Sequence, residues 1–465
     1  MSKPTEAILI GAGQRGAEAY APYALAHPDQ LQFVAVAEPD EARRARFASQ
    51  HHIPPENQFT SWEDLLERPQ YGAAALVCTQ DWQHTQPALA ALRRGYHVLL
   101  EKPMATTAAD CRNLVQTSRD SGRQLHICHV LRYTPHFRKM REIVQSGDLG
   151  QVVNLDQREN VGFWHMAHSY VRGNWRNSQL SSPMILAKCC HDLDVLPWVL
   201  DRRCERLSSV GSLIHYRPEN APPGAPPRCL DGCPASQTCP YYAPWFYLTL
   251  VPLWRSFVAT GKGFEKLGMQ LNLRAPGLVK AISPWVPPLR RLNPYREWPL
   301  TVVAIDPTPA NLEAALRSGP YGRCVYHCDN NVVDHQVVSM AFEGGASVTL
   351  TMHGHSHIEY RTTRIEGTRA RLTAEFGVGG SWIRVEEHRS DRQTVYDTSA
   401  SSGAGHGGGD FALLDAFIKS IQGDCEPART TAAQALESHL MAFSAEQARL
   451  EKRVVSAEEF STVDL

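Results

Sequence analysis

The sequence predicts an α/β protein that combines a doubly wound parallel sheet with an α+β domain built on a large, open, mostly antiparallel sheet. Strand and helix signals alternate from residue 6 to about residue 130 with short connections, which is typical of a parallel sheet covered by helices on both faces. From about residue 131 the alternating segments become longer. In residues 331–354, NVVDHQVVSMAFEGGASVTLTMHG, two strand-like runs flank a Gly-Gly turn, which favours an antiparallel hairpin.

The expected strands of the parallel sheet are short apolar runs, and segments of helical composition separate them. The strands are expected at residues 6–13, 31–38, 73–79, 97–102 and 124–129. The helices between them are expected at residues 15–27, 40–50, 84–95 and 107–122. Strands that are each followed by a helix pair in parallel, so this order predicts a single parallel sheet.

Two domains and one insertion follow from the change of pattern. Residues 1–130 are expected to form the first domain and residues 131–465 the second. A Pro-rich, Cys-containing stretch of weak periodicity, at about residues 217–323, is expected to be an insertion in the second domain. Residues 403–409, GAGHGGG, predict a loop. Two amphipathic helices, near 410–422 and 430–452, are expected to close the chain.

Composition excludes several classes of partner. Of the 465 residues 43% are apolar and 20% charged, and 47 Lys and Arg residues balance 48 Asp and Glu residues. This balance gives no indication of binding to nucleic acid or to an anionic membrane. The N-terminal residues lack a secretory signal pattern, and no run of about 18 apolar residues predicts a spanning helix. A cytoplasmic location is expected, where the 12 cysteines are expected to be reduced thiols or metal ligands.

A glycine motif follows the first predicted strand. Gly11, Gly13 and Gly16 form G-x-G-x-x-G between a strand and a helix. The first glycine permits a tight turn, the second lets the backbone approach a pyrophosphate, and the third lets helix and strand pack closely. The helix N-terminus then offers N–H donors to phosphate. Such glycines also make ordinary turns, but the strand-motif-helix order predicts a dinucleotide site.

Glu38 ends the second predicted strand, where an acidic side chain accepts hydrogen bonds from the adenosine ribose. A carboxylate there repels a 2′-phosphate, so the sequence favours NAD over NADP. Arg43 and Arg44 lie nearby and could weaken this preference. The alternative is a solvated glutamate at a strand end.

Three segments carry a resemblance to a known family. These are the glycine motif, residues 78–107, CTQDWQHTQPALAALRRGYHVLLEKPMATT, and residues 132–152, RYTPHFRKMREIVQSGDLGQV. Together they resemble the Gfo/Idh/MocA family of NAD(P)-dependent sugar and polyol oxidoreductases, whose first domain is a Rossmann fold. The insertion is not part of the common family pattern.

The resemblance implies that Lys102 is the active-site lysine, beside the nicotinamide and the substrate hydroxyl. An ammonium there stabilises negative charge that develops on the hydroxyl oxygen as hydride leaves carbon. Pro103 matches a family turn that often has a cis bond. The alternative is a lysine that only pairs with its neighbour Glu101. The resemblance also implies cofactor contacts from Gln14, Arg15, Thr79, Trp82, His84, Glu101 and Lys102.

Residues 183–200, PMILAKCCHDLDVLPWVL, occupy the place where the family carries Asp-x-x-x-His. His191 matches the histidine, which the resemblance implies to be a general acid/base or a group that polarises the reacting hydroxyl. The aspartate position is Ala187 in this chain, and Lys188 follows it. Two carboxylates remain nearby, either as helix caps or as partners of His191 or substrate: Asp192 and Asp194. The family pattern also makes Tyr133 a candidate for proton transfer.

Aromatic and polar side chains near residues 164–177 are candidates for substrate binding. Trp164 and Trp175 could stack on the C–H face of a sugar ring. Further substrate contacts are expected from His165, His168, Asn174, Arg176, Lys188 and Asp192. The alternative is that the tryptophans belong to the core and the polar residues to an exposed loop.

Cys229, Cys233 and Cys239 have the spacing C-x3-C-x5-C. Only the first spacing falls in the usual range for zinc sites. A structural zinc ion or an iron–sulfur cluster would need a fourth ligand, such as Cys204, Cys324, Cys328 or a histidine. The alternative is a set of small buried apolar side chains.

The expected function is hydride transfer between NAD and a sugar, polyol or glycoside hydroxyl carbon, with Lys102 and His191 handling the hydroxyl proton. A second possibility is a glycosidase, since some members of this family oxidise the sugar transiently, eliminate the aglycone, add water and re-reduce the ketone. A third is an NAD-binding sensor without catalysis. A small-molecule carbohydrate is the expected partner, and relatives commonly pair through their open sheets, so a homo-oligomer, a dimer or tetramer, is expected.

Overall fold

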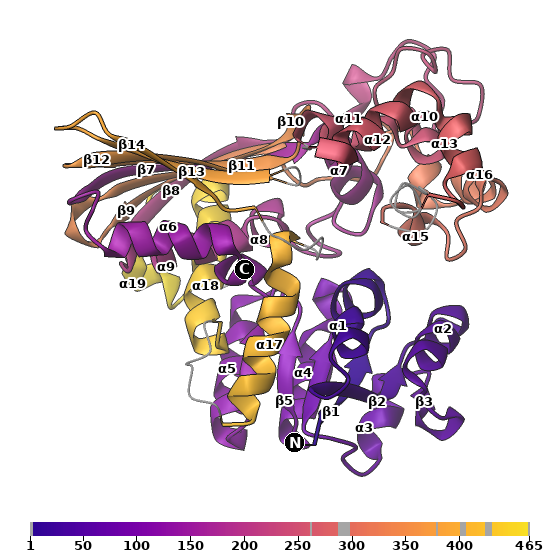
Figure 1. The fold of residues 1–465 in the computed structure, drawn as a ribbon, viewed down its shortest axis with the longest axis horizontal. Helices are drawn as coiled ribbons and strands as arrows, with labels where there is room; N and C mark the ends of the chain where they lie inside the picture. Colours follow the sequence, from indigo (N-terminus) through magenta and orange to yellow (C-terminus); the bar gives the residue numbers. More distant parts are fainter. Residues whose placement is uncertain are drawn as a thin grey trace.

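The computed structural model describes residues 3–260, 263–286, 298–377, 380–399, 406–423 and 430–463. Two sheets organise them (Figure 1): sheet A, with six strands, lies in the N-terminal part, and sheet B, with nine strands, lies in the C-terminal part. The loop expected at residues 403–409 lies in part outside the described residues, and its residues 406–408 form a turn of 3-10 helix before the next helix.

Sheet A has the strand order β3-β2-β1-β4-β5-β6, and every neighbouring pair is parallel, as predicted. Its strands are β1 (Thr5–Ile10), β2 (Leu31–Ala37), β3 (Gln58–Phe59), β4 (Ala74–Val77), β5 (His97–Leu100) and β6 (Leu125–Ile127). The sequence did not predict β3 or the helix after it, α3 (Trp62–Glu67), because a two-residue strand carries no periodic signal.

Helices α2, α3 and α5 of this part begin at positions capped by a side chain. Thr107 accepts a hydrogen bond from the N–H of Asp110 at the start of α5, and Asp40 accepts one from Arg43 at the start of α2. α5 ends at Gly122 with φ +64°, a conformation that glycine adopts without strain. The helical elements are η1 (Gln14–Tyr20), α1 (Ala21–Ala26), α2 (Glu41–His51), η3 (Asp81–Gln83), α4 (Thr85–Arg93) and α5 (Ala108–Ser121).

The strand order reverses between β1 and β4. The loops that leave the carboxyl ends of β1, β2, β4 and β5 therefore meet along one edge of sheet A. In open α/β sheets ligands bind at such an edge, in the crevice where the order reverses. The glycine motif and Lys102 both lie in these loops.

Sheet B has the order β14-β13-β12-β11-β7-β10-β9-β8-β15, and only the pair β7 and β10 is parallel. The predicted hairpin is β9 and β10, which turn through Gly344 and Gly345 at positive φ. The strands are β7 (Val152–Gly162), β8 (Cys204–Ser212), β9 (His335–Phe342), β10 (Ser347–Ser356), β11 (Tyr360–Gly367), β12 (Ala370–Gly377), β13 (Gly380–Glu387), β14 (Gln393–Asp397) and β15 (Val455–Ser456).

Helices lie against one face of sheet B (Figure 1), where their apolar side chains join a core that reaches into sheet A. These helices are α6 (Pro135–Gln145), α9 (Cys190–Leu200), α18 (Ala432–Glu451) and α19 (Ala457–Phe460). A buried ion pair holds α9 to η4 (Val130–Tyr133): Arg132 donates from Nε to Asp194 Oδ2 (2.6 Å) and from Nη2 to Oδ1 (2.7 Å).

The final part of the chain returns to the first core. Leu413 and Phe417 of α17 (Gly409–Ile421) are buried with residues of β1 and β2, and Gln422 donates a hydrogen bond to Thr5 Oγ1 (3.0 Å). The unit around sheet A therefore includes a helix that the division at residue 130 assigned to the second domain. Both closing helices, α17 and α18, lie where the sequence predicted them.

The insertion connects β8 to β9 and is largely helical, which its weak periodicity did not predict. Phe246, Tyr247 and Leu312 are buried in a separate apolar cluster, and Trp164 of the second domain joins them. Its helices are α10 (Ala243–Thr249), α11 (Val251–Thr260), α12 (Gly263–Arg274), α13 (Pro276–Ile282), α15 (Leu300–Val303) and α16 (Pro309–Ser318). Across the described ranges, no helix is both long and apolar enough to cross a membrane.

The Arg132–Asp194 pair gives a test of this core. We expect Asp194→Asn to lower the free energy of unfolding by about 3 kcal/mol, because it leaves a buried guanidinium without its counter-charge. Asp201→Asn is the matched control, since Asp201 at the end of the same helix pairs with Arg141 at an exposed position. It should change stability by less than about 1 kcal/mol. Urea unfolding followed by circular dichroism measures both, and equal effects would contradict the assignment.

Candidate active site

The glycine motif forms a loop whose three glycines have different surroundings. Gly11 has φ +93°, and a Cβ there would lie 2.7 Å from the Cys78 carbonyl oxygen. A Cβ on Gly16 would overlap the carbonyl oxygen of Gly11. A Cβ on Gly13 would meet nothing within 4 Å. Gly11 and Gly16 are therefore needed to build the loop, whereas Gly13 leaves the backbone open to a ligand, as the dinucleotide motif requires.

Glu38 lies against this loop. Its Oε2 accepts a hydrogen bond from the Ala12 N–H (2.8 Å), and its Oε1 accepts one from the Asp40 N–H (3.1 Å). The neighbouring Arg44 donates to the carbonyl of Glu38 (2.6 Å). The carboxylate is thus held at the loop, and the Arg44 guanidinium is hydrogen-bonded to main-chain carbonyls.

These residues fit a dinucleotide. The Thr79 hydroxyl, after β4, is buried and makes no hydrogen bond to any described residue, so it is available to a ligand at the strand-order reversal. A cavity of about 340 Å³ lies beside the loop. It separates the loop from α2 and α15, and its lining includes Gly13, Gln14, Arg43, Arg46 and Thr301.

Glu101 and Arg15, both expected to contact the cofactor, are instead bound to each other. Glu101 Oε1 accepts from Arg15 Nε (2.6 Å) and from the Tyr20 hydroxyl (2.6 Å), and Arg15 Nη2 donates to Asp410 of α17 (2.8 Å). Burial favours protonation of Glu101, but the charges of Arg15 and Lys102 outweigh it and lower the pKa of this carboxyl. Glu101 also accepts from the Lys102 N–H (2.8 Å), so the network fixes the backbone at the lysine.

His84 and Trp82 were also expected to contact the cofactor. His84 lies beside the turn that carries Lys102, whereas Trp82 lies on the surface. His84 is buried, with Nδ1 2.6 Å from the Pro103 carbonyl oxygen and Nε2 3.2 Å from that of Thr79. The Lys102–Pro103 bond is cis, as the resemblance implied. Trp82 is 60% exposed on η3. His84 therefore holds the turn that carries Lys102.

Lys102 reaches from sheet A to the second domain. Its Nζ donates a hydrogen bond to the carbonyl oxygen of Ala187 (2.9 Å), at the end of α8 (Met184–Ala187). Ala187 is the position at which the family pattern has an aspartate. Lys102 thus donates to a main-chain carbonyl at the position where the family pattern has a carboxylate.

His191 lies in the first turn of α9, four residues after Ala187, and is buried. The ring centroids of His191 and His129 are 5.6 Å apart, and those of His129 and His439 are 5.4 Å apart. Burial, together with Arg132 and Lys102, lowers the pKa of His129, and burial lowers the pKa of His439 to about 3. The two histidines behind His191 are therefore neutral at physiological pH. Sequence patterns gave no reason to select either.

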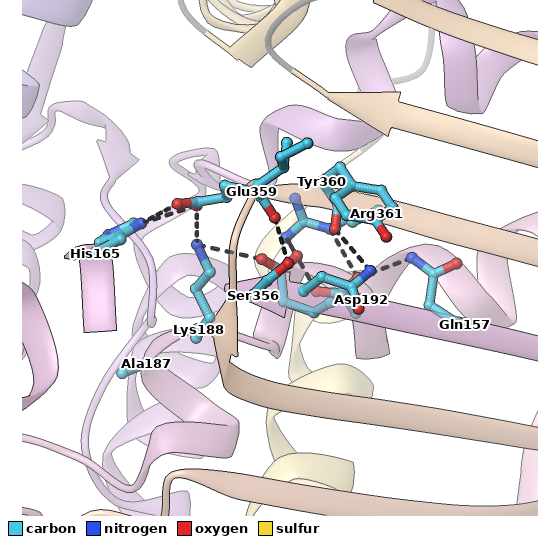
Figure 2. Close-up of polar contacts among 12 residues, drawn as sticks. Gln157, His165, Ala187, Lys188, Asp192, Ser356, Glu359, Tyr360 and Arg361 are labelled. Carbon is cyan, nitrogen blue, oxygen red and sulfur yellow. Dashed lines mark hydrogen bonds and ion pairs between the residues drawn. The ribbon is translucent and has the colours of Figure 1, made fainter. Parts of the chain in front are cut away.

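A network of charged and polar side chains lies beside sheet B (Figure 2). Lys188 Nζ donates to Glu359 Oε1 (2.9 Å) and lies 3.4 Å from Glu159 Oε1. His165 Nδ1 lies 2.7 Å from Glu359 Oε2 and must be the donor, because the carboxylate only accepts. Burial opposes charge on Lys188, but Glu359 and Glu159 outweigh it and raise its pKa. The Glu359 carboxyl has a lowered pKa, since His165 and Lys188 outweigh its burial.

Asp192 belongs to the same network. Arg361 donates from Nε to Asp192 Oδ1 (2.9 Å) and from Nη2 to Oδ2 (3.1 Å), and Gln157 donates to Oδ1 (3.0 Å). Arg361 Nη2 lies 2.6 Å from Glu159 Oε2. Asp194 binds Arg132, and α9 has no side-chain cap. The interpretation of either aspartate as a helix cap is therefore wrong.

Two of the aromatic candidates face the insertion. Trp164 is buried and stacks on Phe246 with ring centroids 5.7 Å apart. His168 is buried, with Nδ1 2.9 Å from the Tyr247 hydroxyl, and stacks on Tyr321 at 4.7 Å. The position of Trp164 matches the alternative in which the tryptophans belong to the core, whereas buried His168 does not match the exposed loop that this alternative expected for the polar residues.

The other loop candidates have separate surroundings. Trp175 Nε1 donates to Asp81 Oδ2 (2.8 Å), which joins the loop to the edge of sheet A. Arg176 Nε donates to Asp329 Oδ1 (2.7 Å) of the insertion. Asn174 is exposed. The Tyr133 ring is buried in the core that contains α17, and its hydroxyl lies 3.1 Å from Thr430 Oγ1, a place that indicates packing rather than proton transfer.

The glycine loop provides a prediction with an internal control. We expect Gly16→Ala to lower the free energy of unfolding by about 2 kcal/mol, since the added Cβ overlaps backbone. Gly13→Ala should leave stability unchanged, because its Cβ meets nothing, but should weaken NAD binding by about tenfold, or 1.4 kcal/mol. Thermal unfolding and titration with NAD measure the two effects. Equal NAD affinity in Gly13→Ala and the parent would contradict the placement of the pyrophosphate.

Family models match both parts of the chain. The model described as "Oxidoreductase family, NAD-binding Rossmann fold" matches residues 6–129. The model described as "GFO/IDH/MocA C-terminal domain" matches residues 137–224. The two matches thus cover sheet A with its helices and the start of the second domain.

Curated relatives match over part of their length. The oxidoreductase YteT of Bacillus subtilis (strain 168) is 27% identical over 205 residues, 43% of this chain and 47% of the relative. The 1,5-anhydro-D-fructose reductase of Ensifer adhaerens is 32% identical over 163 residues, 34% of this chain and 46% of the relative. The chain therefore spans about half the length of the curated relatives it matches.

Solved structures share the fold over nearly the whole chain. A levoglucosan dehydrogenase in complex with NADH and levoglucosan has a TM-score of 0.64 at 15% identity. Its alignment covers 98% of this chain and 99% of the dehydrogenase chain. The aldose-aldose oxidoreductase of Caulobacter crescentus has a TM-score of 0.63 at 15% identity. Its alignment covers 98% of this chain and 100% of the oxidoreductase chain. The two family models identify residues 6–129 as the NAD-binding Rossmann domain and residues 137–224 as the C-terminal domain of the Gfo/Idh/MocA oxidoreductases, and the solved structures share that fold.

Proposed function

We propose that the protein is an NAD-dependent oxidoreductase that moves a hydride between the nicotinamide and a hydroxyl-bearing carbon of a sugar, polyol or glycoside. The observation that carries this proposal is the hydrogen bond from Lys102 to the Ala187 carbonyl. It brings the lysine at the ligand-binding edge of sheet A to the segment that carries His191. Anhydro-sugar and inositol substrates in the names of relatives agree with this class.

The chemistry assigns a separate task to each of the two residues. Oxidation of an alcohol removes a hydride from carbon and a proton from oxygen, and NAD supplies the hydride acceptor. In our proposal the Lys102 ammonium turns from the Ala187 carbonyl to the substrate oxygen and stabilises its developing negative charge. The His191 imidazole takes the proton, since histidine exchanges protons near neutral pH.

Polar groups that lie beside sheet B would bind the remaining hydroxyls. Lys188, Glu359 and His165 are buried for the most part, with side chains 13%, 20% and 17% exposed. Polar groups that are fixed by one another and still reach solvent are suited to hydrogen bonds with neighbouring hydroxyls. The missing aspartate at 187 would then be compensated by Glu359, which precedes β11.

Cofactor choice rests on Glu38. Its carboxylate lies at the glycine loop and would accept from the ribose hydroxyls, while a 2′-phosphate would be repelled. Arg44 is bound to main-chain carbonyls, which supports a preference for NAD over NADP.

A second candidate is a redox-neutral glycoside hydrolase, favoured by the way the insertion covers the cofactor side. Arg46 Nη2 donates to the Ile305 carbonyl (3.0 Å) and Thr301 Oγ1 to Glu18 Oε2 (3.3 Å), across the cavity beside the glycine loop. Such a cover would retain the dinucleotide between turnovers. The sugar would be oxidised, lose its aglycone by elimination, add water and be re-reduced, so that the cofactor ends as it began.

One assay separates the two candidates. Protein purified without added cofactor is offered an aryl glycoside, and released aglycone and NADH are measured together. For the dehydrogenase we expect NADH to accumulate from free sugars or polyols when NAD is added, with no release of aglycone. Aglycone release without net NADH would replace the first candidate by the second.

Lys102→Ala tests the catalytic assignment under either candidate. We expect turnover to fall by about a thousandfold, because charge stabilisation at the reacting oxygen is lost, while NAD still binds. Lys139→Ala is the control, since Lys139 pairs with Glu142 on α6. Binding of NAD is followed by fluorescence, so a loss of cofactor is distinguished from a loss of chemistry. Turnover close to that of the parent would contradict the assignment.

Glu359→Gln tests substrate binding by the charged network. We expect kcat/KM to fall by about tenfold or more, mostly through KM, because one charged acceptor is worth about 1.5 kcal/mol or more, while affinity for NAD stays the same. Glu366→Gln is the matched control, because Glu366 pairs with Arg364 at an exposed position of β11. Steady-state kinetics with the best substrate of the first assay measures both variants. An unchanged KM in Glu359→Gln would place the substrate elsewhere.

A further inference from the structure

The cysteines of the insertion do not fit a metal site. Cys229, Cys233, Cys239 and Cys324 line one small cavity, but no group of three or more His, Cys, Asp or Glu side chains among the described residues could hold a metal ion. The cavity therefore does not fit the zinc ion or iron–sulfur cluster that the spacing suggested. Cys229 and Cys324 are buried, as expected of small apolar side chains.

Tyr170 is a buried tyrosine at the candidate active site. It is 4% exposed, and its ring packs against two aromatic neighbours, with its centroid 5.9 Å from that of His165 and 6.0 Å from that of Trp175. Its hydroxyl makes no hydrogen bond to any described residue, yet the oxygen is not closed off from solvent. Because a buried tyrosine hydroxyl usually has a hydrogen-bond partner, this oxygen is available to a ligand.

The two neighbours of Tyr170 connect it to both parts of the candidate active site. His165 binds Glu359 of the charged network (2.7 Å), and Trp175 donates to Asp81 Oδ2 at the edge of sheet A (2.8 Å). Tyr170 itself lies in the π-helix η5 (Met166–Arg172). This geometry is rare and occurs frequently at functional sites.

The Tyr170 hydroxyl is a neutral donor beside charged groups. Lys188 and Glu359 are the charged side chains that act on it most strongly. Burial outweighs the effect of Lys188 and raises the pKa of this phenol, so it stays protonated at physiological pH. Burial also lowers the pKa of His165, so this imidazole adds no positive charge at neutral pH.

The two cations of the network are already matched by carboxylates. Lys188 Nζ binds Glu359 (2.9 Å), and Arg361 Nε binds Asp192 (2.9 Å). Glu159 lies 3.4 Å from Lys188 Nζ and 2.6 Å from Arg361 Nη2. A substrate carboxylate that reached Lys188 would therefore lie beside Glu359, and like charges repel. A substrate hydroxyl meets no such repulsion.

We propose that Tyr170 determines substrate specificity: its hydroxyl donates a hydrogen bond to an uncharged hydroxyl group of the carbohydrate, and the network beside it disfavours a carboxylate at that position. The substrates are then neutral sugars, polyols or glycosides rather than sugar acids. This inference rests on the proposed function, since it assigns a further contact to the same substrate.

Tyr170→Phe tests the contact, because it removes the hydroxyl and keeps the ring. Binding of neutral sugars and polyols is measured by calorimetry with NADH-loaded protein, in which no hydroxyl is oxidised. We expect the affinity for the tightest ligand to fall by about tenfold, with NADH affinity and thermal stability unchanged. Tyr396→Phe is the matched control, since Tyr396 lies on the edge strand β14, beside Lys139, and should not change the affinity.

Turnover with NAD separates this inference from the proposed function. We expect kcat/KM of Tyr170→Phe to fall mostly through KM. A ligand that binds with the expected loss in Tyr170→Phe but yields no NADH would support the contact and contradict the oxidoreductase. Equal affinity in Tyr170→Phe and the parent would overturn the inference, whether or not NADH forms.

Pairs of a sugar and its uronate test the charge preference. Glucose is compared with glucuronate, and galactose with galacturonate. In the pair that contains the tighter ligand, we expect the neutral sugar to bind at least about tenfold more tightly. Glu359→Gln should narrow this ratio, because Lys188 then has one carboxylate fewer, whereas Glu366→Gln at its exposed position should keep it. A uronate that binds as tightly as its sugar, or a ratio unchanged in Glu359→Gln, would overturn the charge preference.

Discussion

The buried carboxylate of Glu101 holds the candidate active site together. It accepts hydrogen bonds from Arg15, from the Tyr20 hydroxyl and from the Lys102 N–H, and Arg15 extends the connection to Asp410. These contacts join β5, the helix after the glycine loop and the returning α17. The lysine that reaches Ala187 therefore starts from a backbone fixed on three sides, which is what a catalytic group needs to keep its position.

Ala187 changes where charge is supplied in the candidate active site. The family pattern has a carboxylate four residues before the histidine, whereas here Glu159 of β7 and Glu359, just before β11, supply the carboxylates beside Lys188. Lys188 lies between them and keeps its charge because both carboxylates favour it. Charges that satisfy one another in this way retain a fixed geometry without solvent.

Strands, helices and turns that depend on residues close in the chain could be predicted from the sequence. The side chains that bind one another across the fold could not. Alternating strands and helices, the glycine loop, the turn at Lys102 and the start of α9 at His191 each depend on residues close in the chain. Arg15 and His168 were assigned to ligands, but Asp410 and Tyr247, which bind them, are distant in sequence. Glu359 and Arg361 were missed because their role appears only when β11 lies beside β7. The helices of the insertion were missed because they are short and lie between Pro-rich segments, and their apolar residues pack within a separate cluster.

The contact of α15 with the glycine-loop side of sheet A has a consequence for the whole insertion. Glu18 binds Thr301 of α15 and Arg46 binds Ile305 just after it, and both lie beside the cavity that also reaches Gly13. If a bound dinucleotide favours these contacts, the insertion is held more firmly while the dinucleotide is bound, and the dinucleotide binds more tightly while the contacts are made. By thermodynamic reciprocity the two effects are equal in free energy, so the insertion would contribute to the affinity of this protein for its cofactor.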